Sequence, residues 1–332
     1  MTEELLLTTQ PGWAFTTVLE IHARGVESRV PFFHRDSSVV VPASPALIEP
    51  PLLTPAEIFG VLLKAEGSHG EDATAGLRQR LDPTLLKALV LHWLPRIRRS
   101  QPRRYSIASE VFGDTTVHRK ALLNLVERTV RQAFPRWKRT ALGGVRLLCK
   151  ADPKMGALGV QLHTNLGAKE SPRPGTLRMH LACALLTIAQ VQQGDAVFDP
   201  FMGTGTILAA AWKHFGVQRC IGCEIDAKAC DTARRAVKAT DARLHNLSFE
   251  DFEIGLLPRR ITLVSNLPFG ARFAQIPTDR LARFVMRLRG RVDRIILLAG
   301  REQARALTES LDLRAKNVLV LGQQASILYR AS

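Results

Sequence analysis

Short, almost entirely apolar runs alternate with amphipathic helical patterns from about Lys169 to the end of this 332-residue chain. The apolar runs cover residues 196–199, 220–225, 261–266 and 294–300, and two more at 317–321 and 326–330 close the chain. The helical patterns cover residues 206–215, 227–239, 279–289 and 301–311. Strands that are apolar on both faces need cover on both faces, as in a parallel sheet between two layers of helices. The sequence therefore predicts a doubly wound α/β domain, in which ligands bind beyond the carboxyl ends of the strands.

Glycine and acidic residues gather at the ends of these predicted strands. The first strand runs into DPFMGTGT, residues 199–206, where Gly203 and Gly205 allow a tight turn and a close backbone approach to a ligand. The helix that follows directs its amide N–H groups at the same place. Glu224 ends the second strand, where an acid typically binds ribose hydroxyls, and Asp251 follows the third. The patterns GxGxxG and GxxxxGK(S/T) do not occur, which argues against a dinucleotide and against a P-loop.

Two motifs together resemble those of S-adenosylmethionine-dependent amino-methyltransferases, which modify amino groups of nucleobases. They are D-P-F-x-G-x-G-T at residues 199–206 and N-L-P-F at residues 266–269. The resemblance implies S-adenosylmethionine as cofactor, with the glycine loop at its methionine end, Glu224 on the ribose and Asp251 on the adenine amine. The residues that it places around the cofactor are Pro174, Gly175, Thr176, Asp199, Phe201, Gly203, Thr204, Gly205, Thr206, Glu224, Ile225, Asp251 and Asn266.

The stretch SNLPFG, residues 265–270, is the expected place of catalysis. The substrate of such enzymes is an sp² amine, a poor nucleophile because its lone pair is delocalised. The Asn266 oxygen can accept one amine hydrogen and the carbonyl of Leu267 or Pro268 the other, which aligns the lone pair with the methyl group. Phe269 can stack on the base, which must leave its helix to reach the pocket. A plain turn would not need this combination of residues.

The wider match narrows the expected substrate. Residues 171–189 resemble a segment of THUMP-domain tRNA methyltransferases whose Pro-Gly enters the cofactor pocket, and NLPFGARF, with Arg272, is similar to the motif of their guanine-N2 branch. The chain is similar to that family in its opening residues, in residues 103–166 and in its last hairpin. This implies methylation of a guanosine N2 in tRNA, in the acceptor stem. One segment, LGVQLHTNLGAKE at residues 158–170, departs from the usual THUMP pattern.

Three domains are expected: a ferredoxin-like domain at 1–50, a THUMP-like RNA-binding domain at 51–165 and the methyltransferase domain at 166–332. The opening residues predict a strand, a turn and a helix, and residues 39–51 a strand and a proline-rich connection. In the second region, residues 55–67, 83–94 and 121–134 read as helices, residues 105–112, 144–150 and 157–164 as strands, and residues 67–76 as a surface loop.

Basic residues favour a polyanionic partner. Lys and Arg outnumber Asp and Glu by 46 to 30, a net charge of +16, and such an excess is typical of nucleic-acid binding. The candidate RNA-binding residues are Arg96, Arg98, Arg99, Arg103, Arg104, Lys138 and Arg272. A solvated basic surface is the alternative for these residues, and Trp93 and Trp137 are expected in the core.

Other classes of site are less well supported. Cys220 and Cys223 have CxxC spacing, but no second pair of ligands lies nearby, so we expect no metal site, and five cysteines do not suggest a disulfide framework. The sequence shows no membrane span and no signal peptide, and it predicts a cytoplasmic monomer. An rRNA or DNA amino-methyltransferase, and a non-catalytic THUMP-type RNA-binding protein, remain alternatives.

Overall fold

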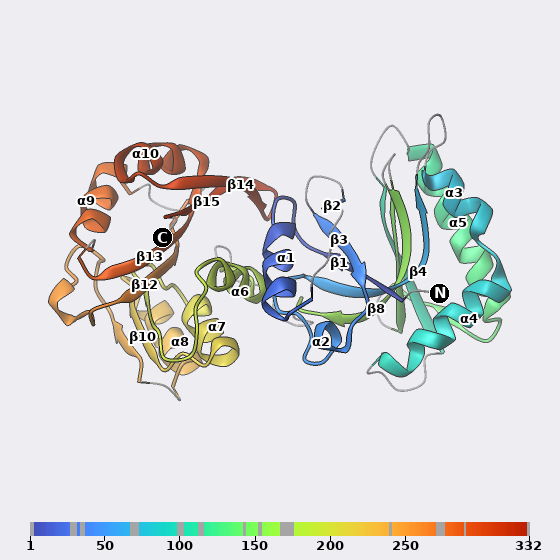
Figure 1. The fold of residues 1–332 in the computed structure, drawn as a ribbon, viewed down its shortest axis with the longest axis horizontal. Coiled ribbons are helices and arrows are strands. Elements are labelled where there is room, and N and C mark those ends of the chain that lie inside the picture. Colours follow the sequence, from blue (N-terminus) through green and yellow to red (C-terminus); the bar gives the residue numbers. More distant parts are fainter. Residues whose placement is uncertain are drawn as a thin grey trace. The chain divides into compact units, whose positions relative to one another are not determined.

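The computed structural model divides the chain into two compact units. Unit 1 comprises residues 1–14 and 21–165, and unit 2 comprises residues 15–20 and 166–332. Each unit is built on its own sheet (Figure 1). The structure describes residues 3–26, 32–33, 37–66, 73–97, 103–111, 116–141, 144–151, 155–166, 176–238, 241–269, 276–288 and 290–330.

Unit 1 contains an eight-stranded mixed sheet in the order β2-β3-β1-β4-β8-β7-β5-β6. Its strands are β1 (Glu4–Thr8), β2 (Phe32–Phe33), β3 (Ser38–Pro42), β4 (Glu57–Glu66), β5 (Arg104–Val111), β6 (Lys138–Arg139), β7 (Val145–Ala151) and β8 (Met155–Thr164). The helices of the N-terminal half are α1 (Ala14–Ala23), which straddles the division between the units, α2 (Pro45–Ile48), α3 (Ala73–Arg80), α4 (Pro83–Trp93) and α5 (Thr116–Ala133). Strand β5 runs parallel to β6 and β7, and the other pairs are antiparallel.

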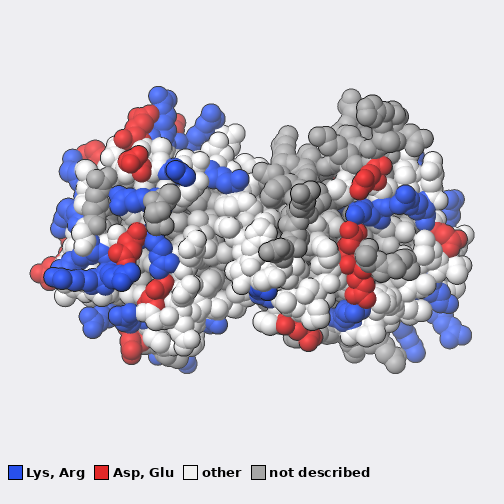
Figure 2. All heavy atoms as spheres, in the orientation of Figure 1, with Lys and Arg blue, Asp and Glu red and all other residues white. Residues whose placement is uncertain are grey.

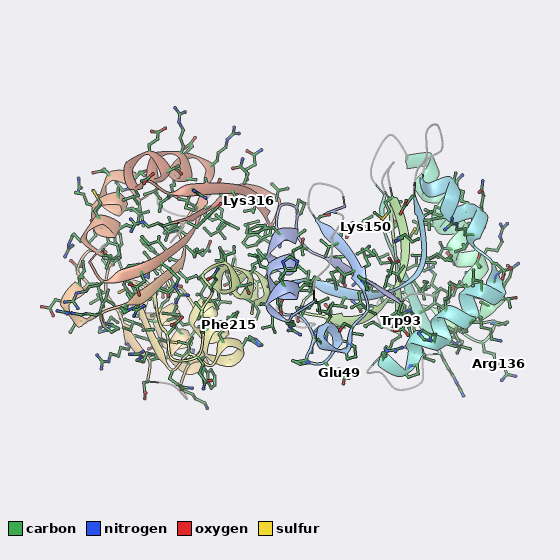
Figure 3. The ribbon with its side chains drawn as sticks, in the orientation of Figure 1. Glu49, Trp93, Arg136, Lys150, Phe215 and Lys316 are labelled. Carbon is green, nitrogen blue, oxygen red and sulfur yellow. The ribbon has the colours of Figure 1, made fainter. Side chains whose placement is uncertain are left out.

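Trp93 is a core residue of unit 1 (labelled in Figure 3). Its side chain is 1% exposed, and its ring covers Gly60 so closely that a Cβ there would lie 2.4 Å from the ring. The expected core position of Trp93 is therefore confirmed. Trp137 is only half-buried and stacks on Phe134, with 4.0 Å between the ring centroids.

The expectation of a helix at residues 55–67 is wrong. These residues form β4, a central strand of the unit 1 sheet. It pairs with β1 on one side and with β8 on the other. Its residues are buried on both faces, so their apolar spacing cannot distinguish a strand from a buried helix. Gly60 favours the strand, because a glycine weakens a helix and here admits the ring of Trp93. The loop expected at residues 67–76 is also shorter than predicted, since α3 begins at Ala73.

The boundary expected near residue 50 crosses a continuous sheet. Strands β1 and β3 precede that position and β4 follows it, yet β1 lies between β3 and β4. Asn165 fastens the connecting segment, because its Nδ2 donates to Leu52 O at 2.8 Å and to Pro55 O at 2.7 Å. The assignment of residues 1–50 and 51–165 to ferredoxin-like and THUMP-like domains stays a prediction.

Unit 2 has the doubly wound α/β fold that the sequence predicted. Its seven strands have the order β11-β10-β9-β12-β13-β15-β14, and the first five are parallel. The strands are β9 (Ala196–Asp199), β10 (Arg219–Cys223), β11 (Arg243–His245), β12 (Ile261–Asn266), β13 (Val292–Gly300), β14 (Arg314–Val320) and β15 (Gln323–Tyr329). The helices are α6 (Met179–Ile188), α7 (Thr206–Phe215), α8 (Ala227–Ala236), α9 (Thr278–Leu288) and α10 (Arg301–Leu311).

The strand order reverses at β9, whose neighbours are β10 and β12. In open α/β sheets the crevice at such a switch point is the usual place for a ligand. An apolar cluster that includes Phe198, Leu263 and Phe284 packs beneath this point. The motifs at residues 199–206 and 265–270 follow β9 and β12, so the fold brings their two starting points together.

Candidate active site

Asp199 joins the two central strands of unit 2. It ends β9, is 1% exposed, and accepts a hydrogen bond from Ser265 Oγ on β12 at 2.6 Å. The same carboxylate oxygen accepts from Phe201 N at 3.1 Å, which shapes the start of the glycine loop. Burial raises the pKa of Asp199 to about 7, although the bond from Ser265 favours the charged form. Asp199 thus holds the loop in place from below.

The glycine loop needs glycine at two positions. Gly203 has φ of +53° and Gly205 has φ of +81°, values that other residues adopt with strain. A Cβ on Gly205 would also lie 2.9 Å from that of Ala233 on α8, whereas a Cβ on Gly203 would meet nothing within 4 Å. The loop leads into α7, which begins at Thr206. The open side of Gly203 is therefore where a ligand can approach the backbone.

Glu224, at the end of β10, is held by backbone amides. Its Oε2 accepts from Gly203 N at 2.9 Å and its Oε1 from Asp226 N at 2.8 Å. Asn246 fixes the backbone beside it by donating to Glu224 O at 2.8 Å and to Ile225 O at 3.1 Å. Each carboxylate oxygen keeps a lone pair for a ligand hydroxyl. The next side chain, Ile225, is 76% exposed and offers an apolar surface beside that position.

The geometry distinguishes Asp251 from its neighbour Glu250. Glu250 is occupied by Arg280 of α9, whose Nε donates to Glu250 Oε1 at 2.6 Å while a terminal nitrogen binds the second oxygen. Asp251 is exposed, and within the described ranges its carboxylate has no hydrogen-bond or ion-pair partner. Asp251 is therefore the better candidate for binding an amine of a ligand.

Asn266 carries an unsatisfied acceptor at the end of β12. Its Oδ1 is buried and finds no donor among the residues that the structure describes. The backbone there is anchored, since Leu267 N donates to Leu298 O on β13 at 2.9 Å. Phe269 packs against Gly300, where an added Cβ would lie 2.9 Å from the Phe269 Cβ. A buried acceptor without a donor is costly, so Asn266 is prepared for a ligand that donates.

Pro268 is already engaged by a residue of α10. Gln303 Nε2 donates to Pro268 O at 3.0 Å. The sequence analysis left two carbonyls, Leu267 O and Pro268 O, as acceptors for the second amine hydrogen. The contact with Gln303 favours Leu267 O, because it already uses one lone pair of Pro268 O. The arrangement can align an amine by hydrogen bonds and by a ring, which is catalysis by position.

Sequence reasoning missed three side chains that organise this site: Ser265, Asn246 and Gln303. Ser265 could have been found, because it lies inside the SNLPFG stretch, beside the proposed catalytic Asn266. Asn246 and Gln303 carry no recognisable spacing. Each donates a hydrogen bond to the backbone carbonyl of a site residue that is distant in the sequence, and such contacts leave no local sequence pattern.

The remaining cofactor candidates lie around this edge or outside the described residues. Thr204 and Thr206 are half-buried in the loop and at the start of α7, and Thr176 is half-buried shortly before α6. Pro174 and Gly175 lie outside the described residues, as does Arg272, so their expected roles stay predictions.

The candidate RNA-binding residues of unit 1 differ in whether an acidic side chain already pairs with them. Arg96 lies 5.0 Å from the Trp93 ring centroid and pairs with Glu3 at 3.3 Å. Arg103, Arg104 and Lys138 are exposed and have no ion-pair partner in the part of the chain that the structure describes. Arg98 and Arg99 lie outside the described residues.

Other basic residues of unit 1 are tied to acids. Arg131 pairs with Glu127 at 2.7 Å, and Arg139 pairs with the same carboxylate. Arg136 projects from the edge of unit 1 (Figure 3). Figure 2 shows basic side chains on the visible face of both units, with acidic ones among them. Charge alone therefore does not mark one binding surface, and the free cations at the start of β5 and at β6 are the better candidates.

The described residues offer neither a metal-binding cluster nor a membrane-spanning helix. No group of three or more His, Cys, Asp or Glu side chains there could hold a metal ion. Cys220 and Cys223 are buried in β10 as free thiols, and burial raises the pKa of each to about 12. None of the described helices is long and apolar enough to cross a membrane.

Comparisons with known proteins find a methyltransferase domain family and two guanine-N2 methyltransferases. Residues 167–282 match the family described as "UPF0020: RMKL-like, methyltransferase domain". The U6 snRNA (guanine-N(2))-methyltransferase THUMPD2 of Bos taurus is 25% identical over 127 residues, 37% of this chain and 24% of that protein. The tRNA (guanine(10)-N2)-dimethyltransferase of Methanothermobacter thermautotrophicus is 36% identical over 81 residues, 24% of this chain and 21% of that protein. The chain thus spans about a quarter of the length of these curated relatives.

Solved structures match over the whole chain. TrmN from Thermus thermophilus has a TM-score of 0.75 at 21% sequence identity, and the match covers 98% of each chain. A predicted N6-adenine-specific DNA methylase from Listeria monocytogenes has a TM-score of 0.66 at 13% identity, covering 100% of this chain and 97% of that one. These likenesses establish the fold. Within this fold, residues 167–282 carry the sequence match to the UPF0020, RMKL-like methyltransferase domain.

Proposed function

We propose that this protein transfers a methyl group to the exocyclic N2 amine of a guanosine in tRNA, within the acceptor stem. The single observation that carries the proposal is the buried, unpaired Oδ1 of Asn266 at the end of β12. It is an acceptor for which the fold supplies no donor within the described residues, at the edge of the sheet where ligands of this fold bind. The names of the guanine-N2 methyltransferases among the relatives support the choice of base.

S-adenosylmethionine is the methyl donor implied by the family, and the residues present fit it. Glu224 has acceptor capacity for ribose hydroxyls beside the open face of Gly203, and Ile225 exposes an apolar surface for a flat ring. Asp251 is exposed, and its carboxylate, which has no partner among the described residues, can accept from the adenine amine. When bound, this cofactor supplies an electrophilic methyl group.

The contribution of the chain to the reaction is position and charge stabilisation. Asn266 Oδ1 accepts one hydrogen of the amine and Leu267 O accepts the other, while Phe269 stacks on the base. Positive charge develops on the amine as it is methylated, and the two oxygens stabilise it. An amide, whether side chain or backbone, cannot take up a proton at neutral pH, so the amine loses its proton to water after the methyl group has arrived.

RNA binding is assigned to unit 1 in this proposal. Arg103, Arg104 and Lys138 are exposed cations without acidic partners among the described residues, and they can contact phosphates. A folded RNA is bound mainly through its shape and its phosphates. The THUMP-like character of residues 51–165, the monomeric state and the cytoplasmic location remain predictions from the sequence.

Nucleoside mass spectrometry tests the proposed function. Purified protein and isotope-labelled S-adenosylmethionine are incubated with tRNA, with rRNA, with small nuclear RNA and with duplex DNA in separate reactions. We expect labelled N2-methylguanosine or N2,N2-dimethylguanosine from tRNA, and far less label after the same time with the Asn266→Ala variant. Label found only in methyladenosine, or only in rRNA, small nuclear RNA or DNA, would contradict the proposal.

A further inference from the structure

Gln303 places a second unpaired acceptor at the loop that holds Asn266. It lies in the first turn of α10 and donates from Nε2 to Pro268 O at 3.0 Å. Its other amide atom, Oε1, is buried and has no donor among the described residues. Asn266 Oδ1 is in the same condition. Asn266, on that loop, and Gln303, bonded to it, therefore each hold a buried side-chain oxygen without a donor among the described residues.

The orientation of the Gln303 amide follows from its neighbour. A carboxamide has one donor end and one acceptor end. Turning it over would place Oε1 against Pro268 O, so two acceptors would face each other. The contact with Pro268 therefore fixes Oε1 as the free end. A ligand that reaches the free end of this amide therefore meets an acceptor and not a donor.

Guanine and adenine differ in what they present to such an acceptor. The Watson–Crick edge of guanine carries hydrogens on two adjacent groups, the ring N1 and the C2 amine. In adenine the amine lies beside an unprotonated N1, which is itself an acceptor. Enzymes that flip a base out read this edge by hydrogen bonds. An oxygen beside the amine-binding loop accepts the N1–H of guanine and repels the N1 of adenine.

The fold does not make this choice. A chain named as a predicted N6-adenine-specific DNA methylase shares the fold at a TM-score of 0.66 over all of this chain. The base must therefore be selected by side chains. Asn266 accepts from an amine and cannot by itself tell the amine of guanine from that of adenine. A second group that senses the neighbouring ring nitrogen is needed.

We propose that Gln303 is this specificity-determining residue, with Nε2 holding Pro268 and Oε1 accepting the N1–H of the target guanine. The proposal rests on the proposed function, since it concerns the substrate of that same site. It predicts that a base with the same C2 amine but without a hydrogen on N1 is a poor substrate. 2-Aminopurine is such a base.

The test pairs enzyme variants with two RNAs. Once mass spectrometry has located the methylated guanosine, a second transcript carries 2-aminopurine at that position, and single-turnover rates are measured on both. The parent protein should prefer guanosine by about 10-fold to 100-fold, because Oε1 meets no donor on 2-aminopurine. In Gln303→Leu the preference should fall to a few-fold. Any effect of the missing O6 is common to all variants and cancels in that comparison.

A second variant separates recognition from support of the loop. In Gln303→Glu the carboxylate still accepts from N1–H but cannot donate to Pro268 O, so both rates should fall while the preference for guanosine persists. Glu302→Gln, an exposed change in the same turn of α10, is the matched control and should alter neither rate. Calorimetric binding of S-adenosylmethionine verifies each fold, and Gln303→Met replaces Gln303→Leu if the latter does not fold.

The outcomes distinguish the two levels of the proposal. If the parent methylates guanosine and the preference survives Gln303→Leu, or if that variant slows both RNAs by the same factor, Gln303 only supports the loop and this inference is wrong. If the parent methylates neither RNA, the proposed function fails and this inference fails with it.

Discussion

The two units hold their candidate functional residues in opposite ways. In unit 2 the candidates lie at the ends of adjacent parallel strands, where Asp199 and Asn266 each end a strand beside the other's. In unit 1 the free cations lie at the start of β5 and on β6, and others of the same type are neutralised by Glu127 or Glu3. In unit 2 a sequence motif therefore marks the site. In unit 1 no motif does so, and candidate phosphate-binding cations differ from other surface cations only in lacking an acidic partner among the described residues.

Two asparagines show the same contrast. Asn165 in unit 1 donates to three backbone carbonyls, Leu52 O, Leu53 O and Pro55 O, and so fastens a connection. Asn266 in unit 2 leaves its Oδ1 without a donor among the described residues. A side chain with its hydrogen bonds made contributes to stability, while one with a bond left open is available for a ligand. Substitution at each should therefore affect a different property.

The largest effect is expected from Asn266→Ala. Loss of one oriented acceptor at the reacting amine should lower the single-turnover rate by about 100-fold to 1000-fold. Asn266→Asp should lose less, because a carboxylate still accepts from the amine. The measurement is methylation of guanosine in tRNA, with S-adenosylmethionine affinity by calorimetry as control. A parental rate in the alanine variant would remove Asn266 from catalysis and with it the contrast to Asn165.

Asp199→Asn should change how the stability of unit 2 depends on pH. The pKa of Asp199 is raised from 3.8 to about 7 by burial, so the folded state holds this proton more tightly than the unfolded state. Its contribution is complete below about pH 4 and is lost as pH rises toward 7. Asparagine does not titrate, so its contribution to stability does not change with pH. Relative to the parent, the free energy of unfolding of the variant should therefore increase by on the order of 3 kcal/mol across that window. Hydrogen exchange of β9 and β12 peptides, compared between variant and parent at pH 4.5 and 7.5, measures this difference. The same stability difference between the two proteins at both pH values would contradict the prediction.

Replacing Arg103, Arg104 and Lys138 together by alanine should weaken tRNA binding by about 10-fold to 100-fold. Each lost phosphate contact removes about 0.7–0.9 from the slope of log affinity against log salt concentration, so the slope should fall by about 2–3. The matched control is the pair Arg131→Ala and Arg139→Ala, whose cations are already paired with Glu127. Equal salt slopes for the two variants would mean that an ion pair with Glu127 does not prevent a cation from binding RNA phosphates. Filter binding over a salt series gives the answer.

Asn165→Ala should produce the smallest effect, a local loss of stability in unit 1. Removing its bonds to the segment at residues 52–55 should cost about 1–2 kcal/mol. Hydrogen exchange in peptides of β4 and β8 should accelerate, while the single-turnover rate on saturating tRNA stays within about twofold, since the site of unit 2 is untouched. A large loss of turnover with unchanged exchange would overturn the assignment of Asn165 to the fold.

Prediction from the sequence worked best where one short segment carries its own geometry. The strand-then-glycine pattern at residues 196–206 and the amide at the end of residues 261–266 were located correctly, because apolar runs and glycines act locally. The strand β4 was misread as a helix, because a strand buried on both faces has no alternation of polar and apolar residues. Its identity came from pairing with β1 and β8, partners that lie far along the chain.

What is local in this chain was therefore readable in its order of residues: the α/β alternation of unit 2, the glycines that need positive φ, and the amide and ring of SNLPFG. Contacts between distant residues were not readable. Ser265 on Asp199, Gln303 on Pro268 and Arg280 on Glu250 each join residues 30 or more positions apart, and the last of these is what favours Asp251 over its neighbour. Hydrogen bonds of this kind depend on distances that exist only after the strands have paired and the helices have packed. Which acceptors are left unpaired for a substrate was thus decided by folding.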